Sequence, residues 1–262
     1  MRVMKAHFRF NDELEDFLAV GTGHVSEYSF VVAPAVKDAI ESLGVPHPEV
    51  DLILVNGRSV GWDYRLAHGD RVSVYPRSQG VVLSPILRLR PEPLRVLRFI
   101  LDAHLGRLAR LLRMLGFDST YDSRADRKRI IETATAEQRM ILTRDRGLLK
   151  DGKVTHGYWV RATHPRLQIE EVVRRLDLRS HFTPFRRCMH CNGILVERPA
   201  TEVAQRVPPR VRDRARAFHQ CNTCGKIYWE GTHVERMRRL IDELSARPHD
   251  DSRSDQSPSP DD

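Results

Sequence analysis

Residues 99–118 constrain the fold more than any other stretch of this chain. They begin with a short apolar run, Phe99-Ile-Leu101, which is typical of a buried strand, and the run ends at a carboxylate, Asp102. Leucines then recur at helical spacing, and Gly116 follows as a C-cap. Another face of the same helix carries Arg107, Arg110 and Arg113. Open α/β sheets bind their ligands at the carboxyl ends of their strands, which is where this pattern places Asp102. The alternative role for Asp102 is that of a helix N-cap.

The same alternation continues further along the chain. A helical pattern covers residues 127–139, an apolar run covers residues 140–143, and Asp145 follows that run. A further strand and a closing helix over residues 170–176 complete the segment. Alternating strands and helices predict a parallel sheet. We therefore expect Asp102 and Asp145 to lie at the same edge of that sheet.

A third acid, Asp126, precedes the helix that should pack on this sheet. Clustered carboxylates repel one another unless a cation neutralises them, and their oxygens suit magnesium or manganese. Such an ion polarises a phosphoryl oxygen and lowers the pKa of a bound water, as phosphodiester hydrolysis requires. The simpler alternatives are an N-cap for Asp126 and a turn for Asp145. The hypothesis is a catalytic metal site formed by Asp102, Asp126 and Asp145.

The charge balance favours nucleic acid as a partner. The 262 residues include 43 Lys and Arg against 35 Asp and Glu, a formal net charge of +8. Arginine suits bidentate phosphate contacts, and we expect Arg107, Arg110 and Arg144 to contact the phosphates of a nucleic acid. The alternative is that net charge affects only solubility and nonspecific binding. The sequence has no apolar run long enough to span a bilayer and no signal peptide, so we expect a cytoplasmic protein without a membrane partner.

The cysteines form two C-x-x-C pairs, Cys188 with Cys191 and Cys221 with Cys224. In a reducing compartment this spacing indicates metal binding rather than disulfides, and four thiolates are typical of structural zinc. The stretch between the pairs is long for a zinc ribbon and rich in arginine, so we expect a basic insertion that either faces a nucleic acid or is simply solvated. Tyr228, after the second pair, either stacks on bases or packs in the small core.

The first 80 residues indicate a separate small domain. Residues 3–10 alternate apolar and charged side chains, residues 34–43 have a helical pattern, and Asn56-Gly57 is typical of a hairpin turn. With the Gly69-Asp70-Arg-Val segment before a last strand, this order resembles the ubiquitin-like β-grasp fold, especially small sulfur-carrier proteins. A carrier requires a free Gly-Gly carboxyl terminus, whereas this chain continues through Pro76. Docking a protein partner and stabilising the neighbouring domain remain as alternative roles.

The remainder of the chain resembles a second family. Three segments show this resemblance: 101–118 (Leu-Asp-Ala-His-Leu-Gly-Arg-Leu-Ala-Arg-Leu-Leu-Arg-Met-Leu-Gly-Phe-Asp), 141–149 and 155–161. They resemble the ribonuclease domain first described at the C-terminus of the Mut-seven exonuclease, which has a PIN-like fold. The resemblance covers most of residues 97–240 and implies metal-dependent RNA cleavage by acids that match Asp102, Asp126 and Asp145. The family usually has further acids after Asp126, where this chain has Arg127-Lys-Arg129.

These patterns, together with the two resemblances, predict an α/β protein with three domains. The expected parts are a ubiquitin-like β-grasp domain (1–80), a linker (81–96), a PIN-like nuclease domain with a parallel sheet (97–182), a zinc ribbon with a basic insertion and a C-terminal helix (183–247) and a disordered tail (248–262). The leading hypothesis is a metal-dependent ribonuclease whose ubiquitin-like domain docks a protein partner. The rival hypothesis is a non-catalytic RNA- or ribosome-binding adaptor, which the Arg127-Lys-Arg129 departure favours.

Overall fold

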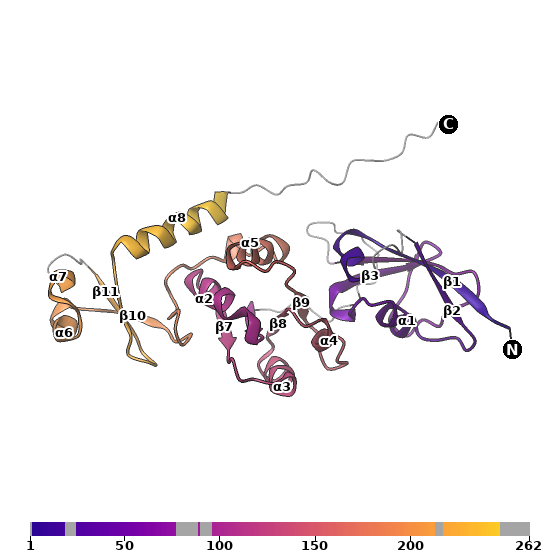
Figure 1. Cartoon of the computed structure of the whole chain (residues 1–262), viewed down its shortest axis with the longest axis horizontal. Helices are drawn as coiled ribbons and strands as arrows, with labels where there is room; N and C mark the ends of the chain where they lie inside the picture. Colours follow the sequence, from indigo (N-terminus) through magenta and orange to yellow (C-terminus); the bar gives the residue numbers. More distant parts are fainter. Residues whose placement is uncertain (1, 19–24, 77–88, 90–95, 213–216, 247–262) are drawn as a thin grey trace, which may run out of the picture. The chain divides into compact units, whose positions relative to one another are not determined.

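The computed structural model describes residues 2–18, 25–76, 89, 96–212 and 217–246 (Figure 1). The chain forms two compact units, residues 1–109 with 119–161 and residues 110–118 with 162–262. The predicted tail, and all of the predicted linker except residues 89 and 96, lie outside the described residues. Within the described ranges, no helix combines the length and apolar character needed to cross a membrane.

A five-stranded sheet with the order β2-β1-β5-β3-β4 forms the N-terminal part of the first unit. Its strands are β1 (Met4–Phe10), β2 (Val25–Phe30), β3 (Val50–Val55), β4 (Arg58–Ser59) and β5 (Arg71–Pro76). β1 pairs antiparallel with β2 and parallel with β5, and the sheet is accompanied by the helices η1 (Asp12–Phe17), α1 (Val36–Ser42) and η2 (His47–Glu49). The predicted ubiquitin-like β-grasp fold is confirmed.

The sequence pattern of this sheet explains its core. Alternate residues of β1, Ala6, Phe8 and Phe10, are fully buried, as expected for a strand with one face on the core. The predicted Asn56-Gly57 hairpin turn joins β3 to β4, and both residues have positive φ (51° and 82°), a conformation that Asn and Gly adopt most readily.

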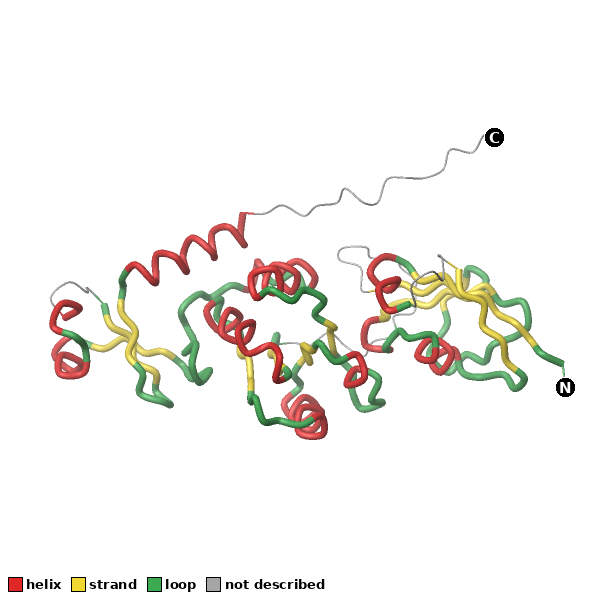
Figure 2. Tube along the Cα trace, viewed as in Figure 1, coloured by secondary structure: helices red, strands yellow, loops and turns green. Residues whose placement is uncertain are grey.

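The second sheet of this unit has four strands in the order β7-β6-β8-β9. They are β6 (Arg98–Leu101), β7 (Asp118–Tyr121), β8 (Met140–Thr143) and β9 (Gly157–Trp159). The helices between them along the chain are η3 (Ala103–Leu105), α2 (Gly106–Met114), α3 (Arg127–Glu137) and α4 (Arg146–Leu149), and residues 110–114 of α2 belong to the second unit. β6 pairs parallel with β8, and β8 pairs parallel with β9, as the alternating pattern predicts. The carboxyl ends of β6 and β8 therefore share one edge. Helices and short strands alternate along this part of the chain (Figure 2).

Helices α3 and α4 lie beside this sheet (Figure 1). Ile130, Ile131 and Leu148 from the two helices share a buried cluster with Ile100 of β6 and Ile141 of β8. Every residue of β8 is buried, which explains its uninterrupted apolar run. Helix α4 has only four residues, so it is too short to produce a helical periodicity in the sequence.

The second unit contains the cysteines and a small antiparallel sheet. Its strands are β10 (Leu195–Arg198), β11 (Phe218–Cys221) and β12 (Ile227–Trp229). Its helices are α5 (Pro165–Arg175), η4 (Arg179–His181), α6 (Ala200–Val203), η5 (Ala204–Arg206), α7 (Pro209–Arg212) and α8 (Thr232–Ala246). The insertion between the cysteine pairs is partly helical, and its Val203 and Val207 form a buried cluster with Phe218. This sheet with its cysteine pairs is compatible with the predicted zinc ribbon.

Candidate active site and metal centre

Asp102 joins the ends of the two central strands of the parallel sheet. It follows β6, caps η3 by accepting the His104 N–H at Oδ1 (2.8 Å), and is 4% exposed. Its Oδ2 accepts two bonds from residues at the end of β8, the Thr143 hydroxyl (2.5 Å) and the Arg144 N–H (2.7 Å). Both carboxylate oxygens thus hold neighbouring groups in place.

Asp145 lies one hydrogen bond further along the same network. The Thr143 hydroxyl that donates to Asp102 accepts the N–H of Asp145 (2.8 Å). The side chain of Asp145 caps α4 by accepting the Gly147 N–H at Oδ1 (2.9 Å), and its Oδ2 pairs with Arg127 Nη2 at 2.6 Å. Asp102 and Asp145 therefore lie at the carboxyl ends of β6 and β8, the edge of the sheet predicted for them. The hydroxyl of Thr143 links the two residues.

Asp126 joins the network through its chain neighbour. It is exposed and caps α3 by accepting the Arg129 N–H at Oδ1 (2.8 Å). The next residue, Arg127, is the partner of Asp145. All three aspartates thus serve as helix N-caps, the alternative weighed for Asp102 and Asp126. In the described part of the chain, the aspartates do not form a group of three whose ligand atoms lie within 4.8 Å of one another, and their role as metal ligands stays a prediction.

The arginines expected to contact RNA have different surroundings. Arg107 and Arg110 on α2 are exposed, as contact with phosphate requires. Arg144 Nη1 instead donates to the carbonyl oxygens of Val160 (3.3 Å) and Arg161 (2.9 Å), which ties the end of β8 to the segment after β9. Contact of these three residues with RNA stays a prediction.

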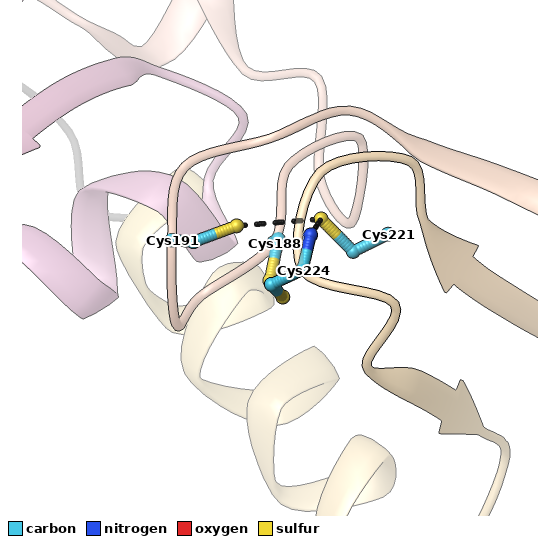
Figure 3. Close-up of side chains that lie close together, drawn as sticks. All are labelled: Cys188, Cys191, Cys221 and Cys224. Atoms are coloured by element: carbon cyan, nitrogen blue, oxygen red, sulfur yellow. Dashed lines mark hydrogen bonds between the residues drawn. The ribbon is translucent and has the colours of Figure 1, made fainter.

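The four cysteines form a compact sulfur cluster (Figure 3). One sulfur from each of Cys188, Cys191, Cys221 and Cys224 lies within 4.8 Å of the others, with 3.7 Å between Cys188 and Cys224 and 3.3 Å between Cys191 and Cys221. Tetrahedral zinc with Zn–S bonds of about 2.3 Å requires S···S separations of about 3.8 Å. The donor set and its size fit a structural zinc ion, which is what the spacing of the pairs predicts.

Backbone groups of the second pair stabilise a thiolate. Cys221 Sγ accepts the N–H groups of Thr223 (3.4 Å) and Cys224 (3.5 Å). Burial opposes ionisation of Cys221, but these N–H bonds and the neighbouring thiols lower its pKa to about 6. Burial and the adjoining thiols raise the pKa of Cys191 to about 12. The proton distribution expected without metal is therefore unequal, and a cation is needed to hold all four sulfurs as thiolates.

Two side chains outside the cysteine pairs support the cluster. The hydroxyl of Tyr228 lies 3.1 Å from Cys188 Sγ. This contact with sulfur differs from both roles predicted for Tyr228, base stacking and apolar packing. Arg113 is 4% exposed, and its Nη1 donates to the carbonyl oxygens of Met189 (3.2 Å) and His190 (2.8 Å) inside the first pair. Burial lowers the pKa of Arg113, and the sulfurs of Cys188 and Cys191 counteract that effect.

Sequence reasoning grouped Arg113 with Arg107 and Arg110, whereas the structure separates it from them. Because each helical residue advances by about 100°, Arg113 lies about 120° around the helix from Arg107, toward the buried leucines. The residues that bind it come more than 70 positions later, so no local signal identifies its partner. Asp118, which accepts from Asn192 Nδ2 (2.8 Å) and pairs with Arg187 (3.2 Å), was missed as an anchor for the same reason.

Comparison with known proteins matches both parts of the chain. Residues 97–241 match the family described as the Mut7-C RNAse domain, and residues 3–82 match the family described as Mut7-C ubiquitin. No curated protein matches the chain. Two solved structures are similar to part of the chain: small archaeal modifier protein 1 of H. volcanii, with 13% sequence identity, and SAMP1 from Haloferax volcanii, with 15%. Each match covers 29% of this chain and 99% of the solved chain, with a TM-score of 0.24.

Proposed function

Because this chain belongs to the Mut7-C RNAse domain family, we propose that it is a metal-dependent ribonuclease that hydrolyses RNA phosphodiester bonds. The observation that carries the proposal is the network from Asp102 through Thr143 to Asp145 and Arg127, which follows the carboxyl ends of two parallel strands. Ligands of open α/β sheets bind at such an edge. An acidic network at that position is suited to an anionic substrate only when a cation accompanies it.

Under this proposal, Asp102, Asp126 and Asp145 would hold magnesium or manganese. The ion would supply polarisation of a phosphoryl oxygen and acidify a bound water. The chain itself orients the ligands, since the hydroxyl of Thr143 and the N–H of Arg144 fix Asp102. Carboxylate oxygens are the ligands these ions prefer, and here they would exchange some capping or ion-pair contacts for the metal.

The other parts of the chain have complementary roles in the proposal. Arg107, Arg110 and Arg144 contact phosphates, and the zinc-bound cysteine cluster supports a small RNA-gripping domain. The ubiquitin-like domain contributes protein interaction. We place this activity in the cytoplasm, where cysteine pairs of this kind remain reduced and bind metal.

A specific observation favours the rival function of a non-catalytic RNA-binding adaptor. Arg127 Nη2 lies 2.6 Å from Asp145 Oδ2, and Arg127 stands where the resemblance to the family implies a further acid. A guanidinium there already neutralises the carboxylate, so the acids would serve as caps and ion-pair partners. An adaptor would bind RNA in a salt-dependent manner and would not cleave it with any divalent ion.

The test is an RNA-cleavage assay in manganese with the full chain. We compare the wild type with the Asp102→Asn plus Asp145→Asn double variant, and with Asp145→Asn alone because Asp102 is buried. Asp151→Asn is the matched control, since Asp151 is an exposed aspartate that caps a turn after α4. The proposal predicts loss of cleavage in both site variants and normal cleavage in the control. Equal activity in all four proteins would refute the catalytic assignment.

A further inference from the structure

The acidic helix η1 of the ubiquitin-like domain contacts an arginine that follows β9. Arg161 Nε pairs with Asp16 at 2.7 Å, and its Nη2 donates to the carbonyl oxygen of Glu13 at 3.0 Å. Burial opposes the charge of Arg161, but Tyr158, Glu49 and Asp16 raise its pKa above the usual value. Arg161 is therefore a permanent cation held against the acidic surface of η1.

A second arginine makes a parallel contact next to the candidate active site. Arg146 directly follows Asp145, and its guanidinium carbon lies 3.8 Å from the centroid of the Trp159 ring and 5.2 Å from that of Phe17. Its Nη2 donates to the carbonyl oxygen of Asp16 at 3.1 Å. The rings of Phe17 and Trp159 are 4.9 Å apart, so the cation lies against an aromatic pair with one ring from each domain.

Contacts from η2 and α1 extend the same surface. The carboxylate of Glu49, 1% exposed, accepts the N–H of Trp159 at 2.5 Å. His47 Nε2 lies 2.7 Å from the carbonyl oxygen of Val154, and Lys150 Nζ donates to the carbonyl oxygen of Glu41 at 3.0 Å. A buried carboxylate with a backbone partner in the other domain is expensive to form unless the two surfaces remain together.

We propose that the ubiquitin-like domain acts in cis as a positioning partner that holds the turn Arg144–Gly147, and with it Asp145, in the arrangement of the candidate active site. Arg144 and Arg146, the residues before and after Asp145, are both connected to η1. Arg146 contacts η1 directly, and Arg144 donates to the carbonyl oxygen of Arg161, which is itself bound to η1. The effect on catalysis rests on the proposed function, whereas the contact itself does not.

The test uses the full chain and a charge reversal on the ubiquitin-like side. Asp16→Arg places a cation against Arg161 and Arg146, while Asp16→Asn removes the charge alone. Asp16 is exposed, so neither change alters the domain core. Asp38→Arg, at an exposed position on α1, is the matched control with the same change in charge. Hydrogen exchange is measured by mass spectrometry on residues 143–149, and RNA cleavage is measured on the same proteins.

We expect amide exchange in residues 143–149 to accelerate about fivefold or more in Asp16→Arg, less in Asp16→Asn and not in Asp38→Arg. In an active enzyme, kcat falls and KM stays within about twofold, because positioning acts on the transition state. Unchanged exchange in both Asp16 variants would overturn the contact. Accelerated exchange with unchanged kcat would overturn the positioning of Asp145. If the wild type does not cleave RNA, the proposed ribonuclease function fails, and the exchange data still decide whether the contact exists.

Discussion

Replacement of Arg113 by methionine tests whether this buried arginine holds the first cysteine pair in its metal-binding conformation. The guanidinium donates to the carbonyl oxygens of Met189 and His190, which stand between Cys188 and Cys191. Methionine fills a similar volume without a donor, so both carbonyl oxygens lose their charged partner. The substitution also removes a positive charge beside a cluster that carries net negative charge when zinc is bound.

The expected magnitude follows from these two contacts. A hydrogen bond from a charged donor contributes about 1.5–3 kcal/mol, and the cost of burying the guanidinium, visible in its lowered pKa, offsets part of the sum. A net loss of about 2–2.7 kcal/mol corresponds to a decrease in zinc affinity of roughly 30- to 100-fold. That range agrees with the effect of about 10- to 100-fold typical of groups that support metal ligands.

Zinc affinity is measured by competition with a chromophoric chelator under reducing conditions. Arg110→Met is the control, because Arg110 belongs to the same helix but is exposed. We expect Arg110→Met to bind zinc as tightly as the wild type. The reasoning is wrong if Arg113→Met also retains wild-type affinity, since the two carbonyl contacts would then contribute nothing to the metal site.

Three further predictions follow from other contacts. Arg127→Ala should tighten Mn²⁺ binding about fivefold in calorimetry, because it removes a cation 2.6 Å from Asp145; unchanged affinity would show that the pair does not compete with metal. Gly116→Ala should lower the free energy of unfolding by about 3 kcal/mol or more in urea titrations, since Gly116 has φ +100° and a Cβ would lie 2.2 Å from the Thr183 carbonyl oxygen. Asp70→Ala should cost about 2–4 kcal/mol, because this buried carboxylate accepts three hydrogen bonds; a loss below 1 kcal/mol in the same titration would contradict that view.

Local sequence patterns predicted most of the secondary structure. The run 140–143 and the alternation of β1 produced clear signals because burial there follows a simple period. The helix expected at residues 170–176 begins earlier, at Pro165, because His164 accepts the Arg166 N–H and starts the helix before its apolar face appears. Short elements such as α4 produced no signal.

The candidate sites were less predictable in their contacts than in their positions. The two strand ends identified Asp102 and Asp145, but not the hydroxyl of Thr143 that connects them. The spacing of the cysteines predicted their cluster, whereas the supporting Arg113 has partners far away in the chain. Long-range pairings of this kind depend on how the helices and strands pack. The residues next to Arg113 in the sequence do not determine that packing.

The contact between η1 and Arg161 also has a consequence for binding competition. The segment between Pro76 and Arg98 joins the two surfaces in one polypeptide, so each meets the other at an effective concentration that does not depend on the cellular concentration of the protein. A separate molecule that sought the η1 surface would have to outcompete this tethered occupant. The apparent affinity of that molecule for η1 would fall by a factor. This factor is the effective concentration divided by the dissociation constant of the contact between η1 and Arg161. Partners of the ubiquitin-like domain should therefore favour a different surface, such as the sheet edge at β2, where Val25 is 56% exposed.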